Sequence, residues 1–287
     1  MILLDELDTP HDATRVLVAH WNRSLERRNV TVRSQERMTA TVRRLAAHMF
    51  PRPLLDATRD DLETWLDDCK VGPTSRRCYL TFVRVFYRWT VDEGLIVVNP
   101  ADRVPVPRMR RYLPRPLGEA DLAHAVAQAP DARMRCWLVL AGWAGLRCQE
   151  IAGLQRSDIL DERDPPLIHV VAAKGGRQRL VPAHPEVLAA LRQLPMPPVG
   201  YLFPHTVRGG MPIEPWSVSH KVGGFLRDCG IPASCHQLRH RFATAVYAVS
   251  HDIRVTQELL GHASPATTAV YAAFSPTDAA AAVAGLR

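Results

Sequence analysis

Residue types that can act on a phosphate group gather between positions 236 and 271. His236, Arg239 and His240 come first, followed by His262 in a Leu-Gly-His sequence and then by Tyr271. Arginine presents a planar fork of donors that matches phosphate oxygens, and a histidine ring can donate or accept a proton near neutral pH. A tyrosine hydroxyl can attack phosphorus as a nucleophile. Together these residues predict chemistry on a phosphate ester.

Each of these residues also has an ordinary interpretation. His236 and His240 would lie on one face of a helix, as a metal-binding pair does, but neither a His-Glu-x-x-His pattern nor a paired cysteine spacing accompanies them. A tyrosine such as Tyr271 is often a half-buried core residue. The complete set nevertheless favours phosphate chemistry, and the sequence predicts neither a metal site nor a cofactor.

Two further cations precede this group in the chain. Arg147 follows a glycine turn, and Glu150 lies three residues later, where it can orient the guanidinium or simply form a surface salt bridge. Residues 167–171 and 177–182 flank a Lys-Gly-Gly turn and predict a β-hairpin. Lys174 then lies at the hairpin tip, where its long side chain can either reach a ligand or remain solvated.

The elements that position these residues are mostly helical. Apolar spacing indicates one sheet region and many helices, so the predicted fold is mainly α with a small β-sheet (α+β) in the C-terminal domain and all-α in the N-terminal domain. Helices are expected over 13–50, from Thr58 or Asp60, from Thr74 or Ser75 to 89, over 119–128, after a cap at Asp131, and over 149–154, 186–194, 216–228, 236–249 and 255–260, with a short strand at 201–204.

The chain of 287 residues is long enough for two domains. Residues 105–116 are rich in proline and arginine and predict an extended linker. We expect a helical DNA-binding domain over 1–104, with a loose end at 1–12, and a second domain over 117–287 that carries the phosphate chemistry; the family resemblance described below implies that the first is of the core type and the second catalytic. The last residues, 275–287, are alanine-rich and form an expected helical tail.

The net charge of +7 suits a polyanionic partner, with a phosphate backbone as the default. Arginines concentrate in the N-terminal helices, where they can contact phosphates or form a solvated face. No apolar run approaches the roughly 20 residues of a membrane span, and the acidic N-terminus lacks a signal-peptide pattern, so a cytoplasmic protein is expected. The candidate DNA contacts are Arg43, Arg44, Arg76, Arg77, Arg84, Arg177 and Lys221.

These residues together resemble the tyrosine recombinase (phage integrase) family over nearly the whole chain, from about residue 13 to the tail. The N-terminal domain is also similar to the family's core-binding domain, with no room before it for an arm-binding domain. The motifs that carry the resemblance are Gly145-Leu146-Arg147 with Glu150, the hairpin Lys174, His236-x-x-Arg239-His240, Leu260-Gly261-His262, and Tyr271 nine residues after His262.

The resemblance implies a metal- and ATP-independent mechanism in which Tyr271 attacks a scissile DNA phosphate and forms a 3′-phosphotyrosyl bond. It implies that Arg147 and Arg239 hold the non-bridging oxygens and that Lys174 protonates the leaving 5′-oxygen. His236 would assist the tyrosine proton and His262 would donate a hydrogen bond to the phosphate. The same resemblance assigns supporting roles to Glu150 and His240.

The expected partners are double-stranded DNA carrying a core-type recombination site, three further copies of the chain in a DNA-bound tetramer, and host or phage accessory factors. When bound to DNA the protein would be associated with the nucleoid. The main hypothesis is a phage or mobile-element integrase, with a Xer-like resolvase of chromosome dimers as the alternative. A type IB topoisomerase and a catalytically silent DNA-binding protein are the remaining alternatives.

Overall fold

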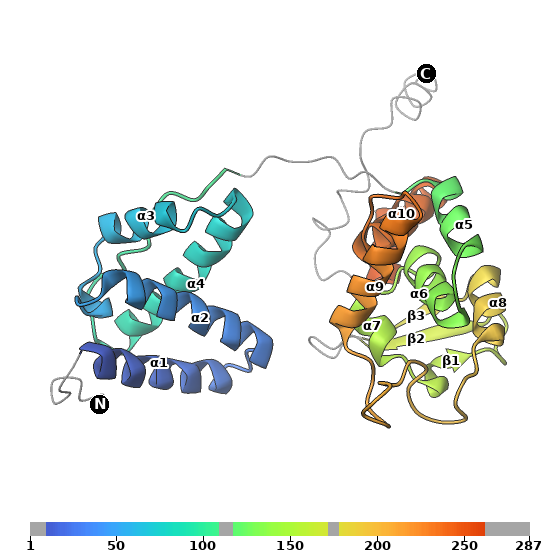
Figure 1. The fold of residues 1–287 in the computed structure, drawn as a ribbon, viewed down its shortest axis with the longest axis horizontal. Coiled ribbons are helices and arrows are strands. Elements are labelled where there is room, and N and C mark those ends of the chain that lie inside the picture. The colour runs from blue at the N-terminus through green and yellow to red at the C-terminus, as the bar shows by residue number, and fades with distance from the viewer. Residues whose placement is uncertain (1–9, 109–116, 172–177, 262–287) are drawn as a thin grey trace, which may run out of the picture. The chain divides into compact units, whose positions relative to one another are not determined.

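The computed structural model describes residues 10–108, 117–171 and 178–261 and divides the chain into two compact units (Figure 1). The first unit comprises Met1–Arg111 and the second Tyr112–Arg287. The point of division lies inside the stretch expected to be a linker. Across the described residues, no helix combines the length and the apolar character needed to cross a membrane.

The N-terminal unit is a helical bundle, as predicted. Its elements are α1 (Pro10–Arg27), α2 (Val32–Met49), the short 3-10 turn η1 (Leu54–Asp56), α3 (Arg59–Asp68) and α4 (Pro73–Asp92). Trp21 of α1 meets Phe86 of α4 edge to face, with ring centroids 5.1 Å apart, and both side chains are fully buried. Burial of such large aromatic groups is a main source of stability for a small bundle.

The first residues of α3 and α4 show which local sequence signals determine where a helix begins. Thr58 caps α3 as expected, because its hydroxyl accepts from the Asp61 N–H while the Asp61 carboxylate accepts from the Thr58 N–H. The expectation that Thr74 or Ser75 caps the next helix is wrong. Helix α4 begins at Pro73, because proline has no N–H to satisfy and its fixed φ suits the first helical position.

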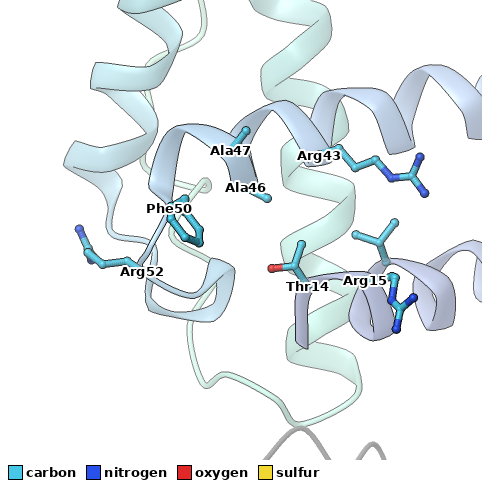
Figure 2. Close-up of a pocket in the computed structure, with 8 residues that line it drawn as sticks. Thr14, Arg15, Arg43, Ala46, Ala47, Phe50 and Arg52 are labelled. Atoms are coloured by element: carbon cyan, nitrogen blue, oxygen red, sulfur yellow. The ribbon is translucent and has the colours of Figure 1, made fainter. Parts of the chain in front are cut away.

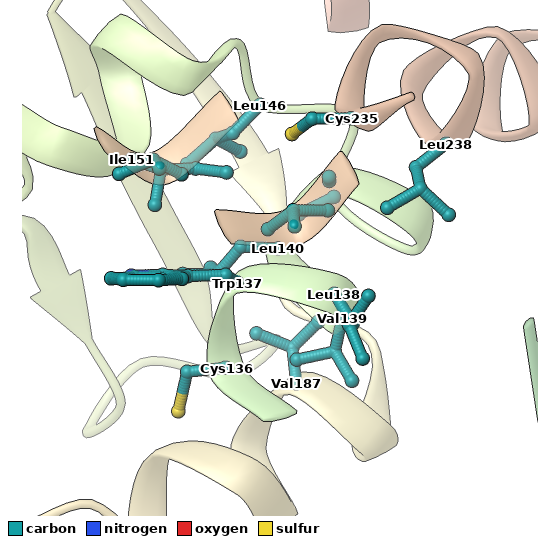
Figure 3. Close-up of a cluster of buried hydrophobic side chains, with 14 of the residues drawn as sticks. Cys136, Trp137, Leu138, Val139, Leu140, Leu146, Ile151, Val187, Cys235 and Leu238 are labelled. Carbon is teal, nitrogen blue, oxygen red and sulfur yellow. The ribbon is translucent and has the colours of Figure 1, made fainter. Parts of the chain in front are cut away.

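Helix α6 (Ala132–Gly142) forms the centre of the C-terminal unit, and Asp131 caps it as predicted. Residues 136–142 are all buried, on every face of the helix, which explains its weak amphipathic pattern. Its neighbours include α5 (Glu119–Ala127), α8 (Pro185–Gln193) and α10 (Cys235–Ser250). Figure 3 shows Trp137, Leu138 and Leu140 of α6 in one cluster with Val187 of α8 and Leu238 of α10.

The small sheet is antiparallel, in the order β1 (Ile159–Leu160), β2 (Leu167–Val171) and β3 (Gln178–Pro182). Ile168 lies opposite Val181 in the register, and both are buried. The two longer strands confirm the predicted hairpin, whose tip at 172–177 lies outside the described residues. The sequence did not predict β1, which contains two residues and follows the 3-10 turn η2 (Arg156–Asp158).

The remaining helices are α7 (Cys148–Gly153), α9 (Pro215–Asp228) and α11 (Ile253–Leu260). They match the predicted helices to within two residues. The predicted strand at 201–204 is wrong, because Tyr201 and Pro204 make isolated bridges to Gln155 and Pro212 instead of a continuous ladder. A proline in such a short segment removes one of the few donors that a ladder needs.

The loop from α6 to α7 turns at Gly145, which has a positive φ of 64°. A Cβ atom at this position would lie 2.3 Å from Cδ1 of Phe242, a buried residue of α10. The Gly145 carbonyl accepts a hydrogen bond from Arg239 Nη1. Glycine is therefore required both by the backbone conformation and by the close approach of α10.

We expect Gly145→Ala to destabilise the C-terminal unit by about 3 kcal/mol, because it adds overpacking to backbone strain. Gly153→Ala is the matched control, since a Cβ at this helical position meets nothing within 4 Å. We expect this variant to change the free energy of unfolding by only about 1 kcal/mol. Urea denaturation of both variants measures the difference. Equal midpoints for the two variants would contradict the assigned role of Gly145.

Candidate active site around Glu150

Glu150 lies in the first turn of α7 and has a side chain that is 3% exposed. Its carboxylate accepts hydrogen bonds from the backbone N–H of Arg147 at 2.8 Å and from Arg147 Nη1 at 2.9 Å. The alternative of an ordinary surface salt bridge is therefore wrong, because the carboxylate is buried. A buried carboxylate requires cationic or hydrogen-bonding partners, and Glu150 has more than one.

Arg179, on strand β3, is the strongest of these partners. Its Nη1 and Nη2 donate to the two Glu150 oxygens at 2.8 Å each, and its Nε donates to the Leu259 carbonyl at 2.7 Å. The side chain is 8% exposed. The sequence analysis missed this residue, although Arg179 shares a strand face with the buried Val181. Strand alternation thus places an arginine on the core face, where it needs an acidic partner.

Arg239, on α10, is the third cation of this cluster. Its Nη1 lies 3.5 Å from Glu150 Oε2, and its side chain is 2% exposed. Its two terminal nitrogens donate to the carbonyls of Gly145 and Leu260. Arg147 Nη1 also reaches the Leu260 carbonyl, at 3.4 Å, but its side chain remains 38% exposed. Of the three arginines, Arg147 is the one most open to solvent.

The charge balance of the cluster favours an anionic ligand. Burial by itself would raise the pKa of Glu150, but the hydrogen bonds and charge of Arg179, the Arg147 backbone N–H and the charge of Arg239 lower it to about 2. The carboxylate is ionised at neutral pH, so three positive charges face one negative charge. The excess of positive charge suits the equatorial oxygens of a phosphate in a transition state.

The end of α11 is held by the same arginines. Its carbonyls at Leu259 and Leu260 accept from Arg179 and Arg239, and Gly261 follows with a left-handed φ of 61°. His262 is the next residue in sequence. Together with Lys174, Arg177 and Tyr271 it lies outside the described residues, so the roles predicted for these four residues stay predictions.

His236 and His240 stand one turn apart on α10, with ring centroids 4.4 Å apart in an edge-to-face arrangement. Burial, together with the charges of Arg239 and Arg147, lowers the pKa of His236. Burial, His236 and Arg239 lower the pKa of His240 to about 4. Both rings are neutral at pH 7, which leaves His236 able to accept a proton. In the described parts of the chain, no group of three or more His, Cys, Asp or Glu residues could hold a metal ion.

The candidate DNA contacts differ in their surroundings. Arg43 and Arg44 of α2, Arg77 of α4 and Lys221 of α9 are exposed. Arg44 donates to the Tyr79 hydroxyl at 2.8 Å and lies 5.9 Å from the centroid of that ring. A hollow of about 620 Å³ lies between α1 and α2. Arg15, Arg43 and Arg52 line part of it (Figure 2). It belongs to the N-terminal unit and includes no residue of the Glu150 cluster.

Two predicted DNA contacts are occupied within the protein. Arg84 donates from Nε to the Ala101 carbonyl at 3.0 Å and from Nη2 to the Val104 carbonyl at 2.7 Å. These bonds stabilise the turn after α4. Arg84 therefore has a structural role and is not among the DNA contacts that we propose. Arg76 forms an ion pair with the exposed Asp67, which reduces the net charge that it presents to an anion.

Comparisons with known proteins decide the family. The model of the phage integrase family matches residues 119–277, more than half of the chain. The chain belongs to the phage integrase family of tyrosine recombinases. Tyrosine recombinase XerD of Caulobacter vibrioides is 32% identical over 246 residues, which cover 76% of this chain and 77% of that protein. Tyrosine recombinase XerC of Xylella fastidiosa strain M23 is 39% identical over 203 residues, 67% of each chain.

Solved structures share the fold of this recombinase. A λ integrase (75–356) dimer bound to a COC′ core site has a TM-score of 0.73 at 18% identity and covers 90% of this chain and 94% of its own. The XerH site-specific recombinase bound to a palindromic difH substrate, in a post-cleavage complex, has a TM-score of 0.77 at 17% identity and covers 98% of both chains. The predicted fold class and the predicted enzyme class, a tyrosine site-specific recombinase, are thus confirmed.

We expect Glu150→Gln to lower the free energy of unfolding of the recombinase by about 3 kcal/mol, because it leaves three arginines around a neutral amide. Chemical denaturation measures this loss. Glu162→Gln, at an exposed loop position, is the control and should match the wild type. A Glu150→Gln variant as stable as this control would show that the carboxylate does not hold the cluster together.

The partly buried His240 predicts an acid-dependent loss of stability. His240 has an ordinary pKa of 6.5 when unfolded and a pKa of about 4 when folded. Between these values the unfolded chain binds the additional proton, so stability falls as the pH is lowered from 6.5 towards 4.

The melting temperature of His240→Gln should therefore decrease less than that of the wild type when the pH is lowered from 7 to 5, as measured by circular dichroism. His124→Gln, at an exposed position of α5, should keep the wild-type dependence. If all three proteins lose the same amount, His240 does not stay neutral in the folded state.

Proposed function

We propose that the recombinase cleaves and rejoins double-stranded DNA at a specific site through a 3′-phosphotyrosyl bond to Tyr271. The observation that carries this proposal is the meeting of Arg147 and Arg239 at buried Glu150, with His236 near enough to feel the charges of both arginines, inside the region that matches the family model. Arg147 lies at the start of α7, whereas His236 and Arg239 lie on α10, about ninety residues later in the sequence. Their convergence on one point is what binding and activating a single phosphate requires.

The proposed reaction begins with attack by the Tyr271 oxygen on the scissile phosphorus. The phenol proton passes to His236, whose lowered pKa keeps its ring neutral and ready to accept it. Arg147 and Arg239 oppose the charge that builds on the non-bridging oxygens, with Arg147 the more accessible of the two. His262 adds a hydrogen bond to the same oxygens.

The bond from phosphorus to the 5′-oxygen then breaks, and this oxygen takes the proton that the Lys174 ammonium carries. The phosphotyrosyl bond retains the free energy of the broken phosphodiester, so rejoining needs no ATP. A 5′-hydroxyl from a partner strand attacks the phosphotyrosyl group and releases Tyr271. Exchange of partner strands in this step produces recombination.

The proposed DNA surface of the N-terminal unit is the exposed face formed by α2 and α4. Arg44 packs beside Tyr79, and Arg37 lies 5.7 Å from the ring centroid of Phe82. Such arginines present charge on a surface stiffened by aromatic rings, as backbone binding to DNA requires. Arg43 and Arg77 extend this charge, and Lys221 is a candidate contact on the C-terminal unit.

We propose a homotetramer as the form in which the recombinase exchanges strands. In support, a λ integrase of the same fold was solved as a tetramer bound to a Holliday junction, with a TM-score of 0.71. Four protomers provide the four cleavages that two duplexes need. The tail at 275–287 is our candidate for the segment exchanged between protomers, and accessory factors of host or phage origin are proposed regulators.

Two biological roles are supported. Integration and excision of a phage or mobile element fits the arginine-rich N-terminal unit and the family model. Resolution of chromosome dimers is favoured by the XerC and XerD relatives, which are 32–39% identical over two thirds or more of the chain. The position of the cleavage site on DNA separates the two roles.

A covalent-adduct assay tests the proposed function, with Tyr271→Phe as the matched variant. The protein is incubated in EDTA with sheared host and element DNA, denatured in detergent and captured, and the attached DNA is sequenced. We expect adducts at one discrete sequence with the wild type and none with Tyr271→Phe, because the variant lacks the attacking oxygen. A site at the junctions of a mobile element supports integration, and a chromosomal site apart from any element supports dimer resolution.

Other outcomes would replace the proposal. Adducts scattered over many sequences, with relaxation of supercoiled plasmid, would identify a type IB topoisomerase. No adduct, with DNA binding intact in both proteins, would identify a DNA-binding protein without catalysis.

A further inference from the structure

Arg179 uses all three of its guanidinium nitrogens to join three separate elements of the C-terminal unit. It lies on β3, its terminal nitrogens bind Glu150 of α7, and its Nε binds the Leu259 carbonyl at the end of α11. A bidentate pair with a carboxylate fixes direction as well as distance. No other arginine described in this unit bonds both to a buried carboxylate through two nitrogens and to the α11 turn through a third.

We propose that Arg179 is a positioning residue of the recombinase, and that it holds the β-hairpin in the orientation from which Lys174 delivers its proton. This inference rests on the proposed function, in which Lys174 protonates the leaving 5′-oxygen. Lys174 precedes Arg179 by five residues in the same predicted hairpin. The rigid strand that follows the hairpin tip is therefore the one that Arg179 fastens to the arginine cluster.

Loss of Arg179 removes this link and leaves the phosphate-binding residues with other supports. Arg147 keeps Glu150 through two hydrogen bonds within its own turn. Arg239 keeps its bonds to Gly145 and Leu260 and remains near Glu150. Strand β3 keeps its pairing with β2 but loses these hydrogen bonds to α7 and α11. We therefore expect loss of Arg179 to displace strand β3 more than the phosphate-binding arginines.

A lysine cannot replace Arg179, because the contacts at this position require a planar guanidinium group. Gly261 packs against the guanidinium, and a Cβ at Gly261 would lie 3.1 Å from Arg179 Nη1. A lysine at position 179 would bring a single ammonium in place of a planar fork and could not reach both Glu150 oxygens and the Leu259 carbonyl in the same geometry. Arg179→Lys should therefore restore little of the function that Arg179→Gln loses.

The test compares two DNA substrates that differ in one atom. Both are duplex oligonucleotides carrying the sequence recovered in the adduct assay, and in the second the 5′-bridging oxygen of the scissile phosphate is replaced by sulfur. A thiol has a pKa of about 8.5, so the thiolate leaves without taking a proton. A variant whose defect is proton delivery recovers on the sulfur substrate, whereas a variant with impaired phosphate binding does not.

We expect Arg179→Gln to form the covalent adduct about 100-fold more slowly than the wild type on the oxygen substrate, the size of a lost general acid. On the sulfur substrate it should approach the wild-type rate, as Lys174→Ala should. Arg147→Gln should stay slow on both substrates. Arg156→Gln is the matched control, because Arg156 bonds to a carbonyl and a carboxylate but belongs to no part of the Glu150 cluster.

Three outcomes would overturn the inference. The first is that Arg179→Gln reacts as fast as Arg156→Gln on the oxygen substrate, and the second is that it stays as slow as Arg147→Gln on the sulfur substrate. The third is that Arg179→Lys reacts at the wild-type rate on the oxygen substrate. Melting temperatures of all variants separate a positioning defect from unfolding, which would depress the rate on both substrates equally. Failure of the wild type to form an adduct on either substrate would contradict the proposed function and this inference with it.

Discussion

The structure of the catalytic unit depends on one buried negative charge, the carboxylate of Glu150. It receives hydrogen bonds from Arg147 and Arg179 and lies within ion-pair distance of Arg239. Removing a carboxylate from water is costly unless its partners are held in good geometry, and here α7, β3 and α10 supply those partners. The carboxylate in turn allows three guanidinium groups to stand close together, which without it would repel one another.

The cluster also carries a net positive charge, which suits an anionic ligand. Its excess positive charge is fixed before a phosphate arrives, so little reorganisation is needed when charge develops on the oxygens. Burial, together with the charge of Arg239, lowers the pKa of His236 and His240 and keeps both rings uncharged. In the proposed reaction, a single arrangement thus provides cations for the phosphate and a neutral base for the nucleophile.

Sequence patterns predicted the parts of the site that depend on local spacing. Arg147, His236 and Arg239 were identified from motifs, and the helix starts at Thr58 and Asp131 from capping chemistry. Long-range packing was not accessible in this way. The contacts of Arg179 with Glu150 and Leu259 depend on the packing of β3 against α7 and α11, which local spacing does not predict. The break between α1 and α2, where Asn29 adopts a left-handed φ of 54°, was missed because neither a glycine nor a proline marks it in the sequence.

The bonds between the arginines and the carbonyls at the end of α11 have a consequence for the synthesis of the protein. Arg147, made early, donates to the Leu260 carbonyl, which lies 113 residues further along the chain and also accepts from Arg239. A nascent chain therefore lacks the complete arginine cluster until the ribosome has released this turn. In the proposed reaction, the recombinase thereby cannot hold a scissile phosphate before its synthesis is nearly complete, and a fragment that ends before α11 cannot hold one either.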